Sequence, residues 1–193
     1  MVAGKLPYLE VYDDEKNAPL AELKAVGAVG HTNRIFCAKF DTLQPSLIYS
    51  GGWDCSLNVW DLRSGKCTAS IFGPQITGEA IDVNPEKHVL LTGSNQIKDG
   101  LQLWDLRTLT LMNRVDWDDK LGGEPTKVYS AKFTNPKKDF IIAGGADKNV
   151  AKIFHAETGK LVQSFGGLDR PCLVTDTSNE GNLCLLGLSD GSI

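Results

Sequence analysis

The sequence predicts an all-β protein made of repeated units, and three observations lead to that prediction. The segment Ser130–Phe133 is similar to Cys37–Phe40, which lies 93 residues earlier in the chain. The pair Gly51-Gly52 returns at the same spacing as Gly144-Gly145. Turn-forming residues recur about every 8–12 positions, and no segment shows the period of a helix, so the chain reads as a series of short strands.

A shorter repeat lies inside this spacing. The segment Trp60–Arg63 recurs 44 residues later as Trp104–Arg107. Weaker copies stand at Tyr12-Asp13 and at Phe154–Lys160. A unit of roughly 46 residues with four short strands is typical of a β-propeller blade. The sequence therefore predicts a β-propeller of four-stranded antiparallel blades.

The first complete unit shows the strand pattern, with extended segments expected at 35–40, 47–50, 57–60 and 68–72. At the N-terminal end, Leu6–Asp13 and Ala18–Val26 resemble the third and fourth strands of a blade. At the C-terminal end, Pro171–Ser178 and Leu183–Leu188 resemble the first and second strands, and Asp190–Ile193 is expected to begin a third.

These segments divide the chain into about four blades' worth of sequence, three whole blades and two complementary half-blades. The units are 6–26 (half-blade), 27–73, 74–119, 124–168 and 169–193 (half-blade). Residues 1–193 are thus expected to be a single propeller domain or part of one. Two arrangements stay open: a piece of a longer propeller, such as a seven-bladed one, or a four-bladed ring closed by pairing of the half-blades. The first is preferred because four blades is the low end of the range.

Composition and charge narrow the class of protein. The 193 residues contain 20 Lys and Arg against 24 Asp and Glu, a net charge of −4, which argues against binding of a polyanion through a broad basic surface. No apolar run approaches the ~20 residues of a membrane span, and Met1–Lys5 lacks the apolar core of a signal peptide. We expect a cytoplasmic protein, with nuclear or cytoskeletal association as alternatives.

The five cysteines fit a reducing compartment. They form an odd set with no C-x-x-C pair, and each has apolar neighbours, so all five are expected to be structural core residues. They are Cys37, Cys55, Cys67, Cys172 and Cys184.

Gly30-His31 followed by Trp60-Asp61, with Asp54 six residues before Trp60, resembles the signature of the WD-repeat family. The resemblance covers nearly the whole chain. It implies a propeller with blades around a central channel. It also implies a structural hydrogen-bond chain made of His31, Ser50, Asp54 and Trp60.

The later units depart from this signature. The second keeps Thr92, Asp99 and Trp104 but has no histidine, and Asn95–Ile97 look inserted in its turn. The third keeps Asp147, carries Phe154 in place of tryptophan, and has one extra residue near Ala151.

Similarity to the family also implies a binding surface on the face of the ring near the histidine-bearing loops. Positions that match its usual contacts are Arg34, Phe36 and Trp53 in the first blade, Thr77, Glu79 and Lys98 in the second, and Lys127, Tyr129 and Ala146 in the third. The preferred partner-binding candidates are Arg34, Phe36, Trp53, Lys98, Lys127 and Tyr129. The competing interpretation is that Phe36 only packs on a neighbouring blade and that Trp53 is only a turn aromatic.

Patterns that suggest chemistry have simpler interpretations. Ser50, His31 and Asp54 are the residue types of a catalytic triad, but a triad also needs an oxyanion donor and a cleft. His88 and His155 lack ligand-spaced partners, and Asp116–Asp119 lacks the glycine and distal glutamate of a calcium loop. The Gly-Lys pairs at 65–66 and 159–160 lack the remaining residues of a phosphate loop. No catalytic, cofactor-binding or metal-binding residues are predicted.

The expected function is therefore a non-catalytic scaffold that mediates protein–protein interactions within a multiprotein assembly. No membrane, small-molecule substrate or cofactor is expected, and the charge balance disfavours nucleic acid. The alternatives are a propeller that recognises a modified peptide or nucleic acid through one ring face, or a small propeller enzyme.

Overall fold

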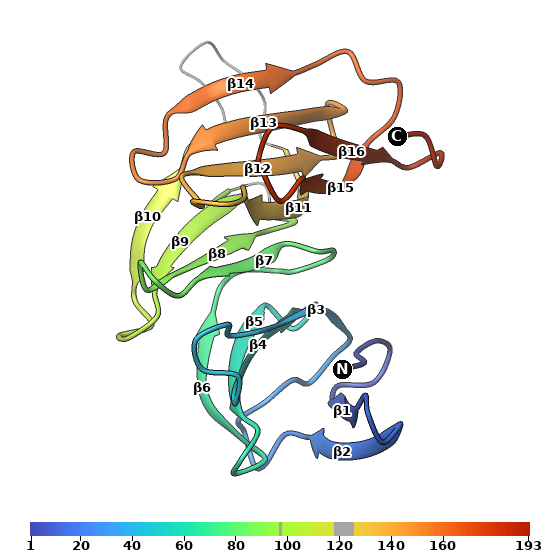
Figure 1. The fold of residues 1–193 in the computed structure, drawn as a ribbon, viewed down its shortest axis with the longest axis vertical. Coiled ribbons are helices and arrows are strands. Elements are labelled where there is room, and N and C mark those ends of the chain that lie inside the picture. The colour runs from blue at the N-terminus through green and yellow to red at the C-terminus, as the bar shows by residue number, and fades with distance from the viewer. Residues whose placement is uncertain (97, 118–125) are drawn as a thin grey trace. The chain divides into compact units, whose positions relative to one another are not determined.

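The computed structural model describes residues 1–96, 98–117 and 126–193. These residues form sixteen strands and no helix. The chain divides into two compact units, unit 1 (Met1–Thr77) and unit 2 (Gly78–Ile193). Figure 1 labels the strands, and the two units are described in turn.

Unit 1 contains a two-stranded and a four-stranded antiparallel sheet. The first pairs β1 (Leu9–Asp13) with β2 (Ala18–Leu23). The second has the order β3 (Ile35–Phe40), β4 (Leu47–Gly52), β5 (Ser56–Asp61) and β6 (Lys66–Phe72). Alternate residues of these strands point to one face, so both sheets contribute to a single core. That core is made of Leu9, Val11, Leu23, Ile35, Ile48 and Trp60.

Unit 2 repeats this design. Its first sheet contains β7 (Ile81–Asn84), β8 (Val89–Gly93), β9 (Leu101–Asp105) and β10 (Leu111–Val115). Its second contains β11 (Val128–Phe133), β12 (Phe140–Gly145), β13 (Val150–His155) and β14 (Leu161–Phe165). A last pair joins β15 (Cys172–Thr177) to β16 (Cys184–Leu188).

The sheets of unit 2 meet through their first strands. β11 contacts β7 and β8 on one side and β15 on the other. The Ser130 hydroxyl lies 2.9 Å from the buried Thr175 hydroxyl across the second junction. The Lys132 ammonium of β11 lies 3.2 Å from the Glu79 carboxylate and 3.4 Å from that of Asp176. These ion pairs connect β11 to the segment before β7 and to β15.

Within each complete sheet the fourth strand is the least buried. The second strands are almost entirely buried, as in β4 and β12, whereas every residue of β14 except Phe165 is exposed. This gradient and the sequential antiparallel order are those of propeller blades. The predicted fold class, all-β with four-stranded antiparallel blades, is confirmed. The prediction of a single propeller domain, in either of its two arrangements, stays a prediction.

Two boundary predictions were wrong. Asp190–Ile193 forms no strand, and the Asp190 carboxylate accepts hydrogen bonds from the Ser192 amide (3.0 Å) and hydroxyl in a turn. Gly191 lies at φ 89°, a conformation that favours glycine and suits this turn. At the other end, the first strand begins at Leu9 rather than Leu6.

The irregular turns follow from strand register. Gly51 pairs with Leu57 in the first complete sheet, and the equivalent Gly144 pairs with Ala151 in the third. The extra residue therefore lies in the turn 146–149 rather than inside the strand. In the second sheet the turn spans 94–100, in agreement with an insertion there, and Ile97 lies outside the described residues.

The cysteines differ in exposure. No disulfide joins the five, and Cys37 and Cys172 are buried as expected. Cys55 and Cys67 are half-buried, and Cys184 is exposed, so the prediction that all five are core residues was wrong for Cys184. Its strand, β16, pairs with β15 only, which leaves its side chains open to solvent.

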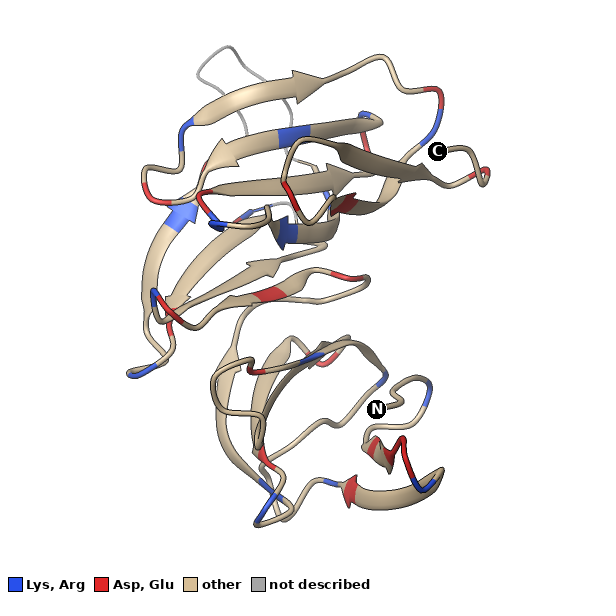
Figure 2. Cartoon of the chain, in the orientation of Figure 1, with Lys and Arg blue, Asp and Glu red and all other residues tan. Residues whose placement is uncertain are grey.

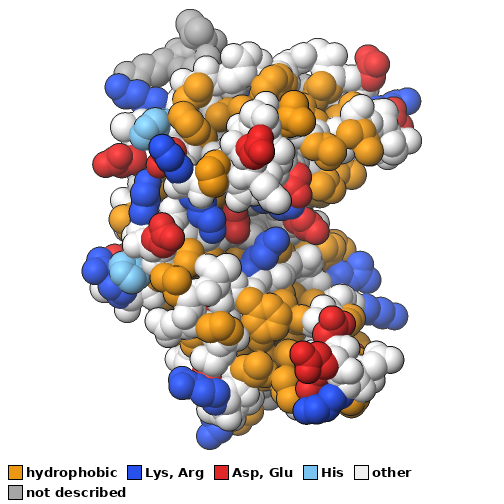
Figure 3. Space-filling model, viewed as in Figure 1, with side chains coloured by type: hydrophobic (Ala, Val, Ile, Leu, Met, Phe, Trp, Pro, Cys, Tyr) orange, Lys and Arg blue, Asp and Glu red, His pale blue; other side chains and the backbone are white. Residues whose placement is uncertain are grey.

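Charged residues concentrate in the turns and strand ends (Figure 2). On the face shown in Figure 3, basic and acidic side chains are interspersed with apolar groups between them. In the part of the chain that the structure describes, no helix has the length and hydrophobicity needed to cross a membrane.

Candidate functional site

A buried hydrogen-bond chain connects the loop before β3 to the centre of the sheet in unit 1. The Trp60 indole N–H donates to Ser50 Oγ at 2.8 Å, and Ser50 Oγ lies 2.8 Å from His31 Nε2. His31 Nδ1 lies 2.8 Å from Asp54 Oδ2. A carboxylate only accepts, so the His31 Nδ1 carries a proton and donates it to Asp54 in a hydrogen bond. The structure thus joins His31, Ser50, Asp54 and Trp60 in one chain of donors and acceptors.

Asp54 ends this chain and holds two further groups. The Thr32 amide donates to its Oδ2 at 2.8 Å, and the Ser56 hydroxyl donates to its Oδ1 at 2.9 Å. Burial raises the pKa of Asp54, but the hydrogen bonds and charge of His31 and the other donors outweigh it and lower this pKa to about 2. The sequence had not singled out Ser56, since a serine two residues after an aspartate is common in turns.

The same distances resemble a catalytic triad, but burial excludes that role for these residues. Ser50 is fully buried and His31 is 1% exposed, so no substrate reaches the hydroxyl. The hydroxyl is also occupied by the Trp60 indole. The chain links a loop to a strand, and no reaction can proceed at Ser50 in this conformation.

Three partner-binding candidates come together beside this hydrogen-bond chain. The rings of Phe36 and Trp53 are 5.2 Å apart between centroids. The Arg34 guanidinium lies 5.3 Å from the Trp53 ring and 5.8 Å from the Phe36 ring. Trp53 is 45% exposed although it is large and apolar. We call Arg34, Phe36 and Trp53 the aromatic cluster.

Backbone contacts fix the position of the aromatic cluster. The Trp53 amide donates to the Arg34 carbonyl at 3.0 Å, which joins the β4–β5 turn to the start of β3. A register shift between Ile35 and Cys37 changes the pairing of β3 with β4 at this point. Trp53 also precedes Asp54, whose carboxylate is held by His31. Phe36 therefore contacts Trp53, and the role of these residues in partner binding stays a prediction.

The other three candidates lie in unit 2 and form no comparable cluster. Lys98 is exposed in the turn between β8 and β9. The Lys127 ammonium lies 3.8 Å from the Asp147 carboxylate, and Tyr129 is half-buried on β11. The structure therefore brings together three of the six candidate residues.

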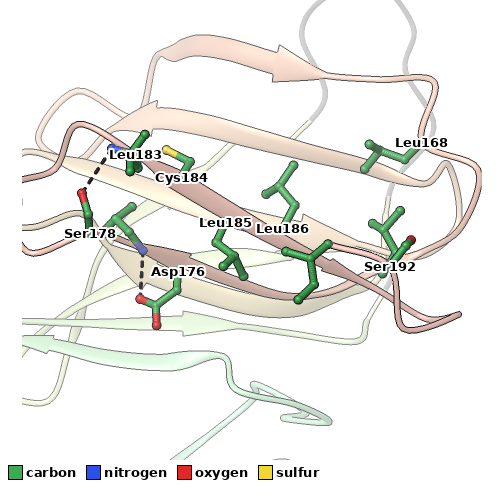
Figure 4. Close-up of a pocket in the computed structure, with 11 residues that line it drawn as sticks. Leu168, Asp176, Ser178, Leu183, Cys184, Leu185, Leu186 and Ser192 are labelled. Atoms are coloured by element: carbon green, nitrogen blue, oxygen red, sulfur yellow. Dashed lines mark hydrogen bonds between the residues drawn. The ribbon is translucent and has the colours of Figure 1, made fainter.

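The structure shows a groove on unit 2 that the sequence did not predict. It has a volume of about 820 Å³ and runs along β16 (Figure 4). Leu183 and Leu185, which are 68% and 45% exposed, line it with Cys184 and Leu186. β16 has a partner on one edge only, whereas the second strand of each complete sheet has two. The segment 183–188 was predicted as a strand, but the exposure of its side chains follows from the pairing of β16 with β15 alone.

Metal-ligand geometry gives no further candidate. No group of three or more His, Cys, Asp or Glu side chains suited to a metal ion occurs within residues 1–96, 98–117 and 126–193. The acidic run that begins at Asp116 continues through Asp118 and Asp119, which lie outside the described residues.

Comparison with known proteins identifies the segment that contains the buried hydrogen-bond chain. Residues 21–61 match the family model of the WD domain, G-beta repeat. The matched segment contains all four residues of the hydrogen-bond chain. This segment is therefore a WD repeat. The matched WD repeat runs from β2 to the end of β5, so one sequence repeat bridges two sheets of unit 1.

Two WD-repeat matches cover most of the chain at low identity. It is 26% identical over 174 residues to the small ribosomal subunit protein RACK1y of Oryza sativa, covering 85% of this chain and 48% of that protein. It is 27% identical over 200 residues to a serine-threonine kinase receptor-associated protein of Dictyostelium discoideum, covering 100% and 60%.

A third match is shorter. The nuclear distribution protein PAC1 of Komagataella phaffii is 32% identical over 87 residues, covering 45% of this chain and 17% of that protein. The chain thus spans about half the length of the rice relative and less than two thirds of the others. The rice and Dictyostelium names place those proteins in a ribosomal subunit and with a receptor.

Proposed function

We propose that this chain is a non-catalytic WD-repeat scaffold of the cytoplasm that binds a protein partner through the aromatic cluster. The observation that carries the proposal is the contact of the half-buried Arg34 and Phe36 side chains with the exposed Trp53 ring. Trp and Arg are the residue types that dominate interface energetics. A large aromatic ring that stays in water contributes little to the stability of a monomer. The same ring stabilises a complex when it buries its surface against a partner.

The hydrogen-bond chain behind the cluster supports the same function. Asp54 follows Trp53 directly and accepts hydrogen bonds from three residues, so the β4–β5 turn has a single defined position. A preorganised surface loses less conformational entropy when it binds. Relatives named for a ribosomal subunit and a receptor association are consistent with such a scaffold.

The test compares capture of partners by three variants of the full 193-residue chain. Trp53→Ala and Arg34→Ala remove the aromatic cluster, and Arg63→Ala is the matched control because Arg63 is an exposed arginine of the same unit. Proteins captured from a cell extract are identified by quantitative mass spectrometry, purified, and measured against each variant by calorimetry. Thermal unfolding and near-UV circular dichroism verify folding.

We expect affinity for the direct partner to fall at least about 30-fold in Trp53→Ala and Arg34→Ala, the size of a hot-spot loss of ~2 kcal/mol. Arg63→Ala is expected to stay within about twofold, because exposed ion pairs contribute little. Unchanged affinity in both folded cluster variants would show that this surface is not the binding site.

A further inference from the structure

Arg34 differs in its electrostatic surroundings from three of the other four arginines of the chain, while Arg170 likewise takes part in none of the ion pairs of the described residues. Arg63, Arg107 and Arg114 lie 3.2, 3.0 and 2.8 Å from the carboxylates of Asp61, Asp105 and Asp99. Across the described ranges 1–96, 98–117 and 126–193, none of the ion pairs includes Arg34. Its positive charge is therefore balanced by no carboxylate of the described chain.

The Arg34 guanidinium contacts two aromatic rings. Its central carbon lies 5.3 Å from the Trp53 ring centroid and 5.8 Å from the Phe36 ring centroid. The N–H groups of a guanidinium lie in its plane and fit a carboxylate through two parallel hydrogen bonds. Contact with two rings also restricts the rotamers of a flexible side chain, so less entropy is lost when the fork binds an anion.

The equivalent position in unit 2 shows why Arg34 lacks a partner. The Ala146 amide donates to the Lys127 carbonyl at 3.1 Å, as the Trp53 amide donates to that of Arg34. There the Lys127 ammonium pairs with Asp147, 3.8 Å away. The counterpart of Asp147 is Asp54, whose carboxylate is held by His31 instead. His31 thus removes the carboxylate that would otherwise neutralise this position.

A second cation lies nearby. The Ile35 amide donates to the Gly4 carbonyl at 3.1 Å, which places the N-terminal segment beside the start of β3. Lys5 follows directly, is exposed, and takes part in no ion pair with a described residue. Figure 2 shows basic positions on the two loops beside the N label. Lys5 is therefore a second cation on a segment next to the start of β3, and Glu10 lines the same small pocket as Lys5.

We infer that the aromatic cluster recognises an acidic segment of a partner protein. The Arg34 guanidinium binds an Asp or Glu carboxylate through its in-plane N–H groups, and an apolar residue next to that carboxylate packs on Trp53. Lys5 adds attraction for a second acidic group. This inference rests on the proposed function and names the chemistry of the partner.

The experiment selects peptides from a random peptide display library on the full 193-residue chain. We expect Asp and Glu, next to an apolar residue, to be enriched at least about threefold over the starting library. The same selection on Arg34→Gln is expected to lose that enrichment, and Arg63→Gln is expected to keep it. Affinity of the best peptide is followed by tryptophan fluorescence, because Trp53 is 45% exposed while Trp60, Trp104 and Trp117 are 0%, 7% and 6% exposed.

Matched peptides define the recognised group. Changing the selected Glu to Gln is expected to lower affinity at least about tenfold, the size of a charge-assisted hydrogen bond. Arg34→Lys is expected to bind about threefold to tenfold more weakly than the natural chain, since an ammonium lacks the planar fork. A phosphoserine peptide that binds more than tenfold tighter than the Glu peptide would overturn the assignment to a carboxylate.

The result also separates this inference from the proposed function. Peptides that depend on Trp53 but show no acidic preference, or that bind Arg34→Gln unchanged, overturn the inference and leave the binding surface in place. Selected peptides that bind Trp53→Ala and Arg34→Gln as tightly as the natural chain overturn both.

Discussion

The complete sheet of unit 1 and the two complete sheets of unit 2 share one framework but differ in buried polarity. Trp60 pairs with Ile48, Trp104 with Leu90 and Phe154 with Ile141, so the three aromatic residues occupy one register position. Two residues further along the second strand stand Ser50, Thr92 and Ala143. The first and second sheets therefore carry a tryptophan and a hydroxyl side chain at these two positions, whereas the third sheet carries neither.

The two positions change together. The Trp60 indole donates to Ser50 at 2.8 Å and the Trp104 indole to Thr92 at 3.0 Å. In the third sheet the residues are Phe154 and Ala143, both fully buried, and no indole N–H needs an acceptor. A buried donor without an acceptor is costly, so tryptophan occurs here with a hydroxyl and phenylalanine with a methyl group. The sheet tolerates either solution because strand pairing and packing volume are maintained.

The turn aspartates show the same contrast. The Asp54 side chain is 6% exposed and bonded to His31. The equivalent Asp99 and Asp147 side chains are 43% and 44% exposed and pair with Arg114 and Lys127. Only the first sheet thus combines a buried carboxylate with a histidine among the described residues. Unit 1 accordingly carries the position-defining network next to the aromatic cluster.

The largest expected effect comes from breaking the buried network. His31→Ala leaves the Asp54 carboxylate and the Ser50 hydroxyl without their buried partner, so the free energy of unfolding is expected to fall by about 3 kcal/mol. Asp99→Ala, the matched change in an exposed pair, is expected to cost less than about 1 kcal/mol. Urea unfolding measures both. Equal losses in the two variants would show that burial does not distinguish the sheets.

A smaller effect is expected from pH. The pKa of Asp54 is about 2 in the folded chain and 3.8 ordinarily, so its contribution is complete above pH 4 and is lost as pH falls toward 2. The natural chain should lose up to about 2 kcal/mol more than Asp54→Asn over this interval. Unfolding curves at several pH values measure the difference. Identical pH profiles of the two chains would contradict the assigned role of Asp54.

The smallest effect is expected when the tryptophan and hydroxyl of the first sheet are introduced at the equivalent positions of the third sheet. Phe154→Trp adds volume and a buried N–H opposite Ala143, so stability is expected to fall by about 1.5 kcal/mol. Adding Ala143→Ser supplies an acceptor and is expected to recover about 1 kcal/mol. A double-mutant cycle measures the coupling. A double variant no more stable than Phe154→Trp alone would contradict the pairing rule.

Much of this architecture was predictable from sequence. The repeats and turn residues predicted the strands, because period-two alternation and turn chemistry act over a few residues. The spacing from His31 to Trp60, read through the family resemblance, also indicated which side chains would join beside the β4–β5 turn. The end of the chain was predicted less well, since Asp190–Ile193 lies in a turn and forms no strand where one was expected.

The candidate site was predicted only as a set of six residues. That Arg34, Phe36 and Trp53 meet depends on pairing of β3 with β4, which brings together loops from different parts of the chain. That Lys127 has an ionic partner and Arg34 has none depends on whether the turn aspartate is engaged by a histidine. The sequence by itself thus determined the repeated strands and the buried aromatic positions, whose causes are local. Only the tertiary structure decided which exposed side chains meet and which charges are neutralised, because those outcomes depend on distances between segments remote in sequence.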